Sequence, residues 1–215
     1  MQKKLRIWLV TIGENLPLEE GICILRTGML AERLAQNQHD VLWWTSAFDH
    51  FQKTWLFQKD TTVKLSGFTI KALKEVGYHK NVSFRRFVDH RIIAHKFKKI
   101  SSAMDPPDII LTATPSYDLA YEAVAFAKAR HIPVLIDIRD EWPDLFMNSM
   151  PGKLKKFLKI IMSHDFRMIK RTLHGADGLI AMMNSLLEWG LKYAGRPKGA
   201  RDRIFYLGHK KPLVD

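Results

Sequence analysis

Residues 5–12 read LRIWLVTI and end at Gly13, and this stretch decides the fold. A continuous apolar run of strand length is typical of a strand that is buried on both faces of a sheet. Residues 23–38 then place apolar side chains at helical spacing, and residues 41–44 (VLWW) form a second apolar run. The order strand, helix, strand predicts two parallel strands joined by a helical crossover.

The same alternation continues to the end of the chain. Further strands are expected at residues 63–66, 69–73, 108–113, 133–138, 178–183 and 203–207, and further helices at residues 83–104, 117–130, 153–173 and 184–193. The prediction is an α/β fold with a doubly wound, Rossmann-like parallel sheet and helices on both faces. One domain is expected over residues 1–207, and residues 208–215 are expected to begin an interdomain linker or tail.

Composition and motif content exclude several classes of protein. The 215 residues are 47% apolar, but no apolar run reaches the roughly 18 to 20 residues of a membrane-spanning helix. Cys23 is the only cysteine, which excludes an internal disulfide and a cysteine-based zinc site and favours the cytoplasm. The motifs GxGxxG, GxxxxGK[ST] and HExxH are missing, so we expect no dinucleotide site, no ATPase loop, no metal and no cofactor.

The chain carries 34 Lys and Arg against 22 Asp and Glu, a net charge of +12 that predicts a polyanionic neighbour. Residues 91–104 predict a helix with one apolar and one basic face. Residues 153–173 repeat this arrangement, and the side chains expected to face the core are Leu154, Phe157, Leu158, Ile161, Met168 and Ile169. Solvated charge is the plain alternative, but two such faces favour apposition to an anionic membrane. The candidate membrane-facing residues are Arg85, Arg86, Arg91, Lys98, Lys99, Lys156, Lys159, Arg167 and Lys170.

Ligands of a doubly wound sheet bind outside the carboxyl ends of its strands, which selects three loops. Residues 13–21 follow the first strand, residues 114–116 follow the run at 108–113, and residues 139–144 (RDEWPD) follow the run at 133–138. The first loop precedes a helix whose free amides suit a phosphate. The candidate cleft residues are Gly13, Glu14, Asn15, Gly21, Arg26, Thr114, Asp137, Arg139, Asp140 and Trp142.

The charged candidates in these loops each have a structural alternative. Arg139 and Asp140 either bind hydroxyl groups of a ligand or form a solvent-exposed pair that latches the loop. Arg26 either holds a phosphate or forms a salt bridge with Glu19 or with Glu20 beside it.

The remaining candidates are judged by burial. Asp137 lies inside an apolar run, so its carboxylate must be paired, either as an anchor for the following loop or as a cleft residue. Trp142 either lines the cleft or caps the core. Trp43 and Trp44 at the end of a strand are expected in the core rather than at a surface on which a ligand stacks.

These loops resemble the N-terminal domain of a GT-B fold glycosyltransferase of the retaining family 4 class, similar to members that act on bacterial surface polysaccharides. The resemblance covers essentially the whole chain. In the first loop the usual paired glycine is replaced by Glu20-Gly21, and the donor-binding C-terminal domain with its paired glutamates does not follow. The residues that carry the resemblance are 12–17 (IGENLP), Arg26 with 29–31 (MLA), 39–46 (HDVLWWTS), 48–50 (FDH) and 137–143 (DIRDEWP).

The resemblance implies an acceptor-binding domain of a metal-independent, hexosyltransferase-like enzyme. Such an enzyme transfers a sugar from a nucleotide-sugar donor, held by a C-terminal domain or second chain, to a lipid-linked or saccharide acceptor. It implies polysaccharide biosynthesis at the inner face of the cell membrane, as a cytoplasmic peripheral protein. The chain alone is expected to be inactive, and no catalytic residue is assigned.

Two alternatives remain open from the sequence. A basic α/β module that binds nucleic acid would also explain the net charge of +12, although no recognition motif for RNA or DNA is visible. The other alternative is a stand-alone binding half that becomes catalytic only with a separate donor-binding chain.

Overall fold

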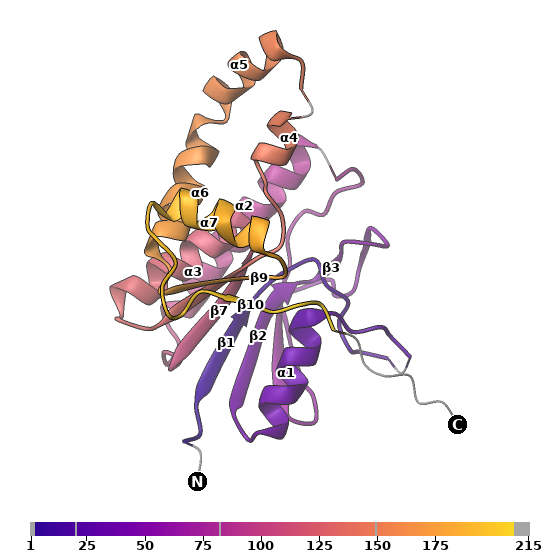
Figure 1. Ribbon diagram of the computed structural model, residues 1–215. Helices are drawn as coiled ribbons and strands as arrows, with labels where there is room; N and C mark the ends of the chain where they lie inside the picture. The colour runs from indigo at the N-terminus through magenta and orange to yellow at the C-terminus, as the bar shows by residue number, and fades with distance from the viewer. Residues whose placement is uncertain (1–2, 20, 82, 149, 209–215) are drawn as a thin grey trace, which may run out of the picture.

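The computed structural model describes residues 3–19, 21–81, 83–148 and 150–208, and its centre is a twisted eight-stranded sheet (Figure 1). The strands of this sheet are β1 (Arg6–Val10), β2 (Asp40–Ser46), β5 (Thr61–Lys64), β6 (Phe68–Leu73), β7 (Ile109–Thr114), β8 (Val134–Ile138), β9 (Gly178–Ala181) and β10 (Arg203–Ile204). Their spatial order is β10-β9-β8-β7-β1-β2-β6-β5, and every neighbouring pair is parallel except β5 with β6. The predicted doubly wound parallel sheet is confirmed.

Helices cover both faces of the sheet, as predicted. The helices that the structure describes are α1 (Arg26–Gln36), α2 (Phe84–Ser101), α3 (Tyr117–Ala129), α4 (Asp144–Asn148), α5 (Gly152–Ile161), α6 (Ser163–Gly175) and α7 (Asn184–Ala194). In β1, Ile7 and Leu9 pack with α1, whereas Trp8 and Val10 pack with α2 and α3 on the opposite face. The apolar run that opens the chain is continuous because both faces of β1 are buried.

An aromatic cluster ties β1 and β2 to the helices on one face. Trp8 lies 5.2 Å from both Trp44 and Phe126 between ring centroids, and Trp44 lies 5.0 Å from Phe97. These are edge-on and stacked arrangements that aromatic rings prefer. Trp43 lies on the other face, fully buried, with its Nε1 donating to the Thr11 carbonyl at 3.0 Å. Trp43 and Trp44 are therefore core residues, as expected.

The helix expected over residues 153–173 is wrong in one respect, because the chain breaks at Met162 into α5 and α6. The prediction that Leu154 and Ile161 face the core is also wrong: they are 44% and 58% exposed, and Ile160 is 74% exposed. The reason is that α5 projects beyond the sheet, as Figure 1 shows, and makes its main contacts with α4 and α6, its neighbours along the chain. The Phe157 side chain lies outside the described part of the structure.

The helix expected over residues 83–104 is confirmed, with its apolar and basic faces as predicted. Ser83 caps α2 by accepting a hydrogen bond from the Arg86 amide at 3.3 Å. Ile93 and Phe97 are buried, whereas the side chains on the opposite face are exposed. The small hairpin of β3 (Phe48–Asp49) and β4 (Thr54–Trp55) was not predicted, nor was α4. Within the described ranges no helix is both long and apolar enough to cross a bilayer.

Candidate functional site

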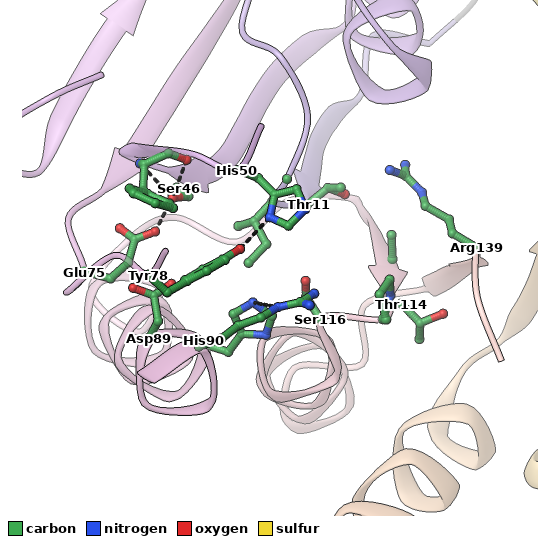
Figure 2. Close-up of a pocket in the computed structure, with 16 residues that line it drawn as sticks. Thr11, Ser46, His50, Glu75, Tyr78, Asp89, His90, Thr114, Ser116 and Arg139 are labelled. Carbon is green, nitrogen blue, oxygen red and sulfur yellow. Dashed lines mark hydrogen bonds between the residues drawn. The ribbon is translucent and has the colours of Figure 1, made fainter. Parts of the chain in front are cut away.

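Strands β1, β2, β7 and β8 end at the same edge of the sheet, and the strand order reverses between β1 and β7. A cavity of about 160 Å³ lies at this edge (Figure 2). Gly13 continues from β1 with φ +80°, a conformation that glycine adopts without strain, and so lets the chain turn along the rim. The polar side chains around the cavity are Thr11, Ser46, His50, Glu75, Tyr78, Arg86, Asp89, His90, Thr114, Ser116 and Arg139.

A buried ion network joins the first loop, α1 and the end of β8. The carboxylate of Asp137 accepts hydrogen bonds from Arg26 Nη1 at 2.7 Å and from Arg139 Nε at 2.8 Å. Arg139 also pairs with Glu14 through Nη1, and its Nη2 donates to Thr27 Oγ1 at 2.9 Å. Glu14 in turn accepts from the Thr27 amide at 2.9 Å. Two carboxylates and two guanidinium groups thus neutralise one another.

The burial of this network makes the pairing necessary. The side chains of Glu14 and Asp137 are each only 3% exposed, and those of Arg26 and Arg139 are 26% and 21% exposed. A buried charge without a partner is costly, whereas a complete set of partners offsets its desolvation. The two carboxylates raise the pKa of Arg139 above its ordinary value despite burial, so this guanidinium stays charged.

The network corrects two expectations from the sequence. Arg139 does not pair with Asp140 in a solvent-exposed latch, because the Asp137 and Glu14 carboxylates hold its guanidinium. Arg26 forms its salt bridge with Asp137 rather than with Glu19. Glu20, the other expected partner, lies outside the described residues. The expectation that a carboxylate at position 137 must be paired is confirmed.

Two carboxyl groups lie inside the cavity wall and differ in ionisation. Burial raises the pKa of Glu75 to about 8, so this side chain holds its proton at neutral pH. Its Oε1 hydrogen-bonds Ser46 Oγ, while Oε2 is buried and has no partner among the described residues. Burial raises the pKa of Asp89 to about 6, although the Gly77 amide donates to its carboxylate at 2.6 Å. Near pH 7 the cavity therefore contains one carboxylic acid and one carboxylate.

The two histidines of the cavity are neutral. Burial, together with the positive charges of Lys53 and Arg86, lowers the pKa of His50 to about 4. Burial, with Arg86 and His50 nearby, lowers the pKa of His90 to about 3. The Tyr78 hydroxyl lies 2.6 Å from His50 Nδ1. The histidines can therefore donate and accept hydrogen bonds but add no charge at neutral pH.

Like Glu75 Oε2, the Thr114 hydroxyl of the cavity is buried without a partner among the residues that the structure describes. Thr114 ends β7, is 1% exposed, and its Oγ1 has no hydrogen-bond partner among the described residues. A buried hydroxyl without a partner costs free energy, which a ligand that accepts or donates there would recover. The Arg86 guanidinium lies on another side of the cavity. Its Nε is 3.5 Å from His90 Nε2, and its Nη1 donates to the Asn81 carbonyl at 2.7 Å. Arg86 is thus half-buried in the cavity wall.

The other sequence candidates take different places. Asp140 and Trp142 line a smaller, adjoining pocket of about 70 Å³ with Arg86 and His90. The Trp142 ring also packs on Phe146, with centroids 5.2 Å apart, and joins the edge of the core. Asn15 Nδ2 donates to the Cys23 carbonyl at 3.1 Å, and Gly21 is exposed in the first loop with φ +82°. Neither of these two lines the cavity described above.

A second, larger groove of about 840 Å³ lies beside the first loop. It runs between α1, with Met29 at its wall, and the chain after β10. Phe205, Tyr206 and Leu207 line it and are 60%, 83% and 66% exposed. Arg139 contributes to both this groove and the cavity, so the two adjoin.

Sequence reasoning did not select Glu75, Asp89 and His90 as site residues, and it assigned Arg86, which lies in the cavity wall, to a membrane-facing surface. Glu75 follows β6, which ends at the same edge of the sheet, but the loop after this strand was not among the three loops selected from the sequence. Asp89 and His90 lie within α2, a helix whose polar side chains were expected on its solvated face. The spacing nevertheless contained a signal. Asp89 precedes Ile93 by four positions and His90 precedes Phe97 by seven, and both spacings place the two residues on one face of a helix.

The comparisons with known proteins show the fold. No protein-family model and no curated protein matches this sequence. The catalytic domain of starch synthase IV from Arabidopsis thaliana, solved with ADP and acarbose, matches with a TM-score of 0.57 and 9% identity over 96% of this chain and 52% of that one. LpCGTa in complex with UDP matches with a TM-score of 0.54 and 13% identity over 99% and 54%.

A third structure has the same architecture. The UDP-forming α,α-trehalose-phosphate synthase from Burkholderia vietnamiensis matches with a TM-score of 0.53 and 10% identity over 91% of this chain and 43% of that one. All three are GT-B glycosyltransferases, and this chain spans about half the length of each. The chain has the Rossmann-like fold of one half of such an enzyme.

The ion network predicts a stability difference between two neighbouring carboxylates. Asp137→Ala leaves Arg26 and Arg139 without a shared carboxylate in a largely buried place, so we expect it to lower the free energy of unfolding by about 3 to 5 kcal/mol. Asp140→Ala removes a half-buried side chain outside the network, so the change should stay within about 0.5 kcal/mol. Urea unfolding of both variants measures the difference, and equal values would show that the network does not stabilise the fold.

Glu75 predicts how stability varies with pH. Between the ordinary pKa of 4.5 and the folded value of about 8, the folded protein holds a proton that the unfolded chain has lost. Stability therefore falls as pH rises through this window. Glu75→Gln keeps the shape and cannot ionise, so its melting temperature should match the unmodified protein at pH 5 and exceed it by several degrees at pH 8. Glu188→Gln, on the exposed face of α7, is the control, and an identical pH profile for all three proteins would contradict the assignment.

Proposed function

We propose that this chain is the acceptor-binding half of a retaining glycosyltransferase, which transfers a sugar from a nucleotide-sugar donor to a lipid-linked saccharide in surface polysaccharide synthesis. The observation that carries the proposal is the cavity at the switch point between β1 and β7. Ligands of this fold class collect there, and the chain has the fold of one half of enzymes whose structures hold UDP or ADP.

The chemistry of the cavity suits sugar hydroxyls. A protonated Glu75, an ionised Asp89 and two neutral histidines offer donors and acceptors in the same small space. A sugar hydroxyl donates one hydrogen bond and accepts others, so a mixed set of this kind satisfies it better than a uniformly charged pocket does. The free Thr114 hydroxyl adds one further contact.

The donor requires a second partner. The groove beside α1 is lined by exposed Phe205, Tyr206 and Leu207, and an apolar surface of this kind is typical of a contact between domains or chains. We place the donor-binding domain, or a separate donor-binding chain, on this groove. Arg139 connects the groove to the cavity, and would thereby hold the acceptor beside the donor.

Acceptor binding is tested with Thr114→Val, which removes a buried hydroxyl that has no partner among the described residues and should not lower the melting temperature. Farnesyl diphosphate that carries N-acetylglucosamine is the lipid-linked saccharide probe, and UDP-glucose is the donor probe. Calorimetry should show binding of the first and much weaker binding of the second, with about tenfold weaker saccharide binding by Thr114→Val.

Thr112→Val is the matched control for this experiment. Thr112 lies on the same strand, but its Oγ1 donates to the Val10 carbonyl at 2.9 Å away from the cavity. This variant should lose stability and keep its affinity for the saccharide probe. Low-micromolar binding of UDP-glucose, sugar transfer by this chain alone, or unchanged affinity in Thr114→Val would overturn the proposal.

The same proposal includes peripheral contact with an anionic membrane, and α5 is the element that supports it. Leu154, Ile160 and Ile161 are exposed on a helix that also carries exposed Lys156 and Lys159. Apolar side chains beside lysines are typical of helices that lie in the interface of an anionic bilayer. Figure 1 shows α5 projecting from the body, where it can reach such a surface.

We expect the chain to sediment with vesicles that contain phosphatidylglycerol and not with pure phosphatidylcholine vesicles, and to bind less as salt rises. Replacing Ile160 and Ile161 with Gln should abolish sedimentation, because it removes the apolar contact without changing the charge. The control replaces Phe51 and Leu56, which are 57% and 36% exposed near β4, with Gln. Equal sedimentation of both double variants would reject the role of α5.

A further inference from the structure

A basic groove lies on the helical layer, outside the cavity at the strand ends. It has a volume of about 360 Å³ and is formed by α2 and α6 on either side of α3. Ala94 and Met168, 5% and 8% exposed, are its most buried apolar side chains. Figure 1 shows α2, α3 and α6 grouped on one side of the sheet.

The sequence builds this groove by repeating one helical spacing. From α2 come Arg91, Ala94, His95 and Lys98, and from α6 come His164, Arg167, Met168 and Arg171. Both sets are spaced i, i+3, i+4, i+7, which places four side chains on a single face of a helix. Two basic stripes thus line opposite sides of one groove, rather than spreading over a flat surface.

Two acidic side chains neutralise only part of this charge. Arg91 Nε lies 3.8 Å from Asp118, and Lys98 Nζ lies 3.3 Å from Glu122, both acids coming from α3. Arg167 uses its Nε for the Ser163 carbonyl at 3.2 Å. The guanidinium of Arg171 has no hydrogen bond or ion pair with any residue that the structure describes.

The resulting charge matches a particular kind of ligand. Four cations, Arg91, Lys98, Arg167 and Arg171, face two carboxylates, so two positive charges remain in the groove. Arg167 and Arg171 are one helical turn apart, and each guanidinium is a planar fork suited to two oxygens of one phosphate. His95 and His164 supply further nitrogen atoms for hydrogen bonds.

We propose that this groove between α2, α3 and α6 is a binding site for a dianionic phosphate monoester. The site is separate from the cavity at the strand ends and does not depend on the proposed glycosyl transfer. The phosphate occupies the space between Arg167 and Arg171 on one side and Lys98 on the other, and relieves the repulsion among the cations. The group that bears the phosphate is either a soluble metabolite or a lipid headgroup.

The test uses the full chain and two probes with the same phosphate chemistry. Calorimetry measures binding of sn-glycerol 3-phosphate, and sedimentation measures binding to phosphatidylcholine vesicles that contain phosphatidic acid. The pocket variant replaces Arg167 and Arg171 with Gln. The control replaces Lys64 and Lys192 with Gln, because these exposed lysines lie outside the groove and outside the candidate membrane-facing residues, and their replacement removes the same total charge.

We expect the pocket variant to bind at least one of the two probes about tenfold more weakly or worse, and the control to change affinity less than twofold. Loss confined to glycerol 3-phosphate identifies a soluble ligand, and loss of vesicle binding identifies a lipid headgroup. Equal weakening by both double variants would show diffuse attraction without a site, and would overturn the proposal, as would no binding of either probe. Unchanged melting temperatures confirm that the variants fold, and neither readout depends on sugar transfer.

Discussion

The sheet edge that carries the cavity depends on the buried pairing of Glu14 and Asp137 with Arg26 and Arg139. Each charged group would destabilise the fold if it stood alone, but together they offset one another's desolvation. The network also ties the first loop and α1 to the end of β8. Arg26 and Asp137 are 111 positions apart in the chain, and Glu14 and Arg139 are 125 positions apart. Because Arg139 lines both the cavity and the neighbouring groove, this one network sets the distance between them.

The cavity at the strand ends and the groove between α2, α3 and α6 differ in charge. At the strand ends, burial keeps Glu75 protonated and His50 and His90 neutral near pH 7, so the cavity consists mainly of hydrogen-bonding groups. On the helical layer, the cations stay exposed to water and exceed the acids beside them. The first environment discriminates by hydrogen-bond geometry, and the second attracts by charge.

Helix α5 shows where periodicity stops being informative. Its apolar residues recur at helical spacing, which predicts a face packed on the core as readily as a face turned toward another surface. Nothing in the local sequence says that the chain breaks at Met162, after which α6 returns to the sheet while α5 stays outside it. The difference is decided by which elements lie within reach, because α6 packs against α3 and α7, whereas the main contacts of α5 are with α4 and α6.

By itself the sequence determined the strands, the crossovers and the edge at which ligands collect, because runs of apolar residues report burial, and burial is local to each element. It also identified Asp137 as a carboxylate that must be paired. Only the tertiary structure decided that its partners are Arg26 and Arg139, and that Glu75, Asp89 and His90 meet in one cavity. The physical reason is that partner choice and pKa depend on which distant segments approach one another and exclude water, and spacing along the chain does not encode either.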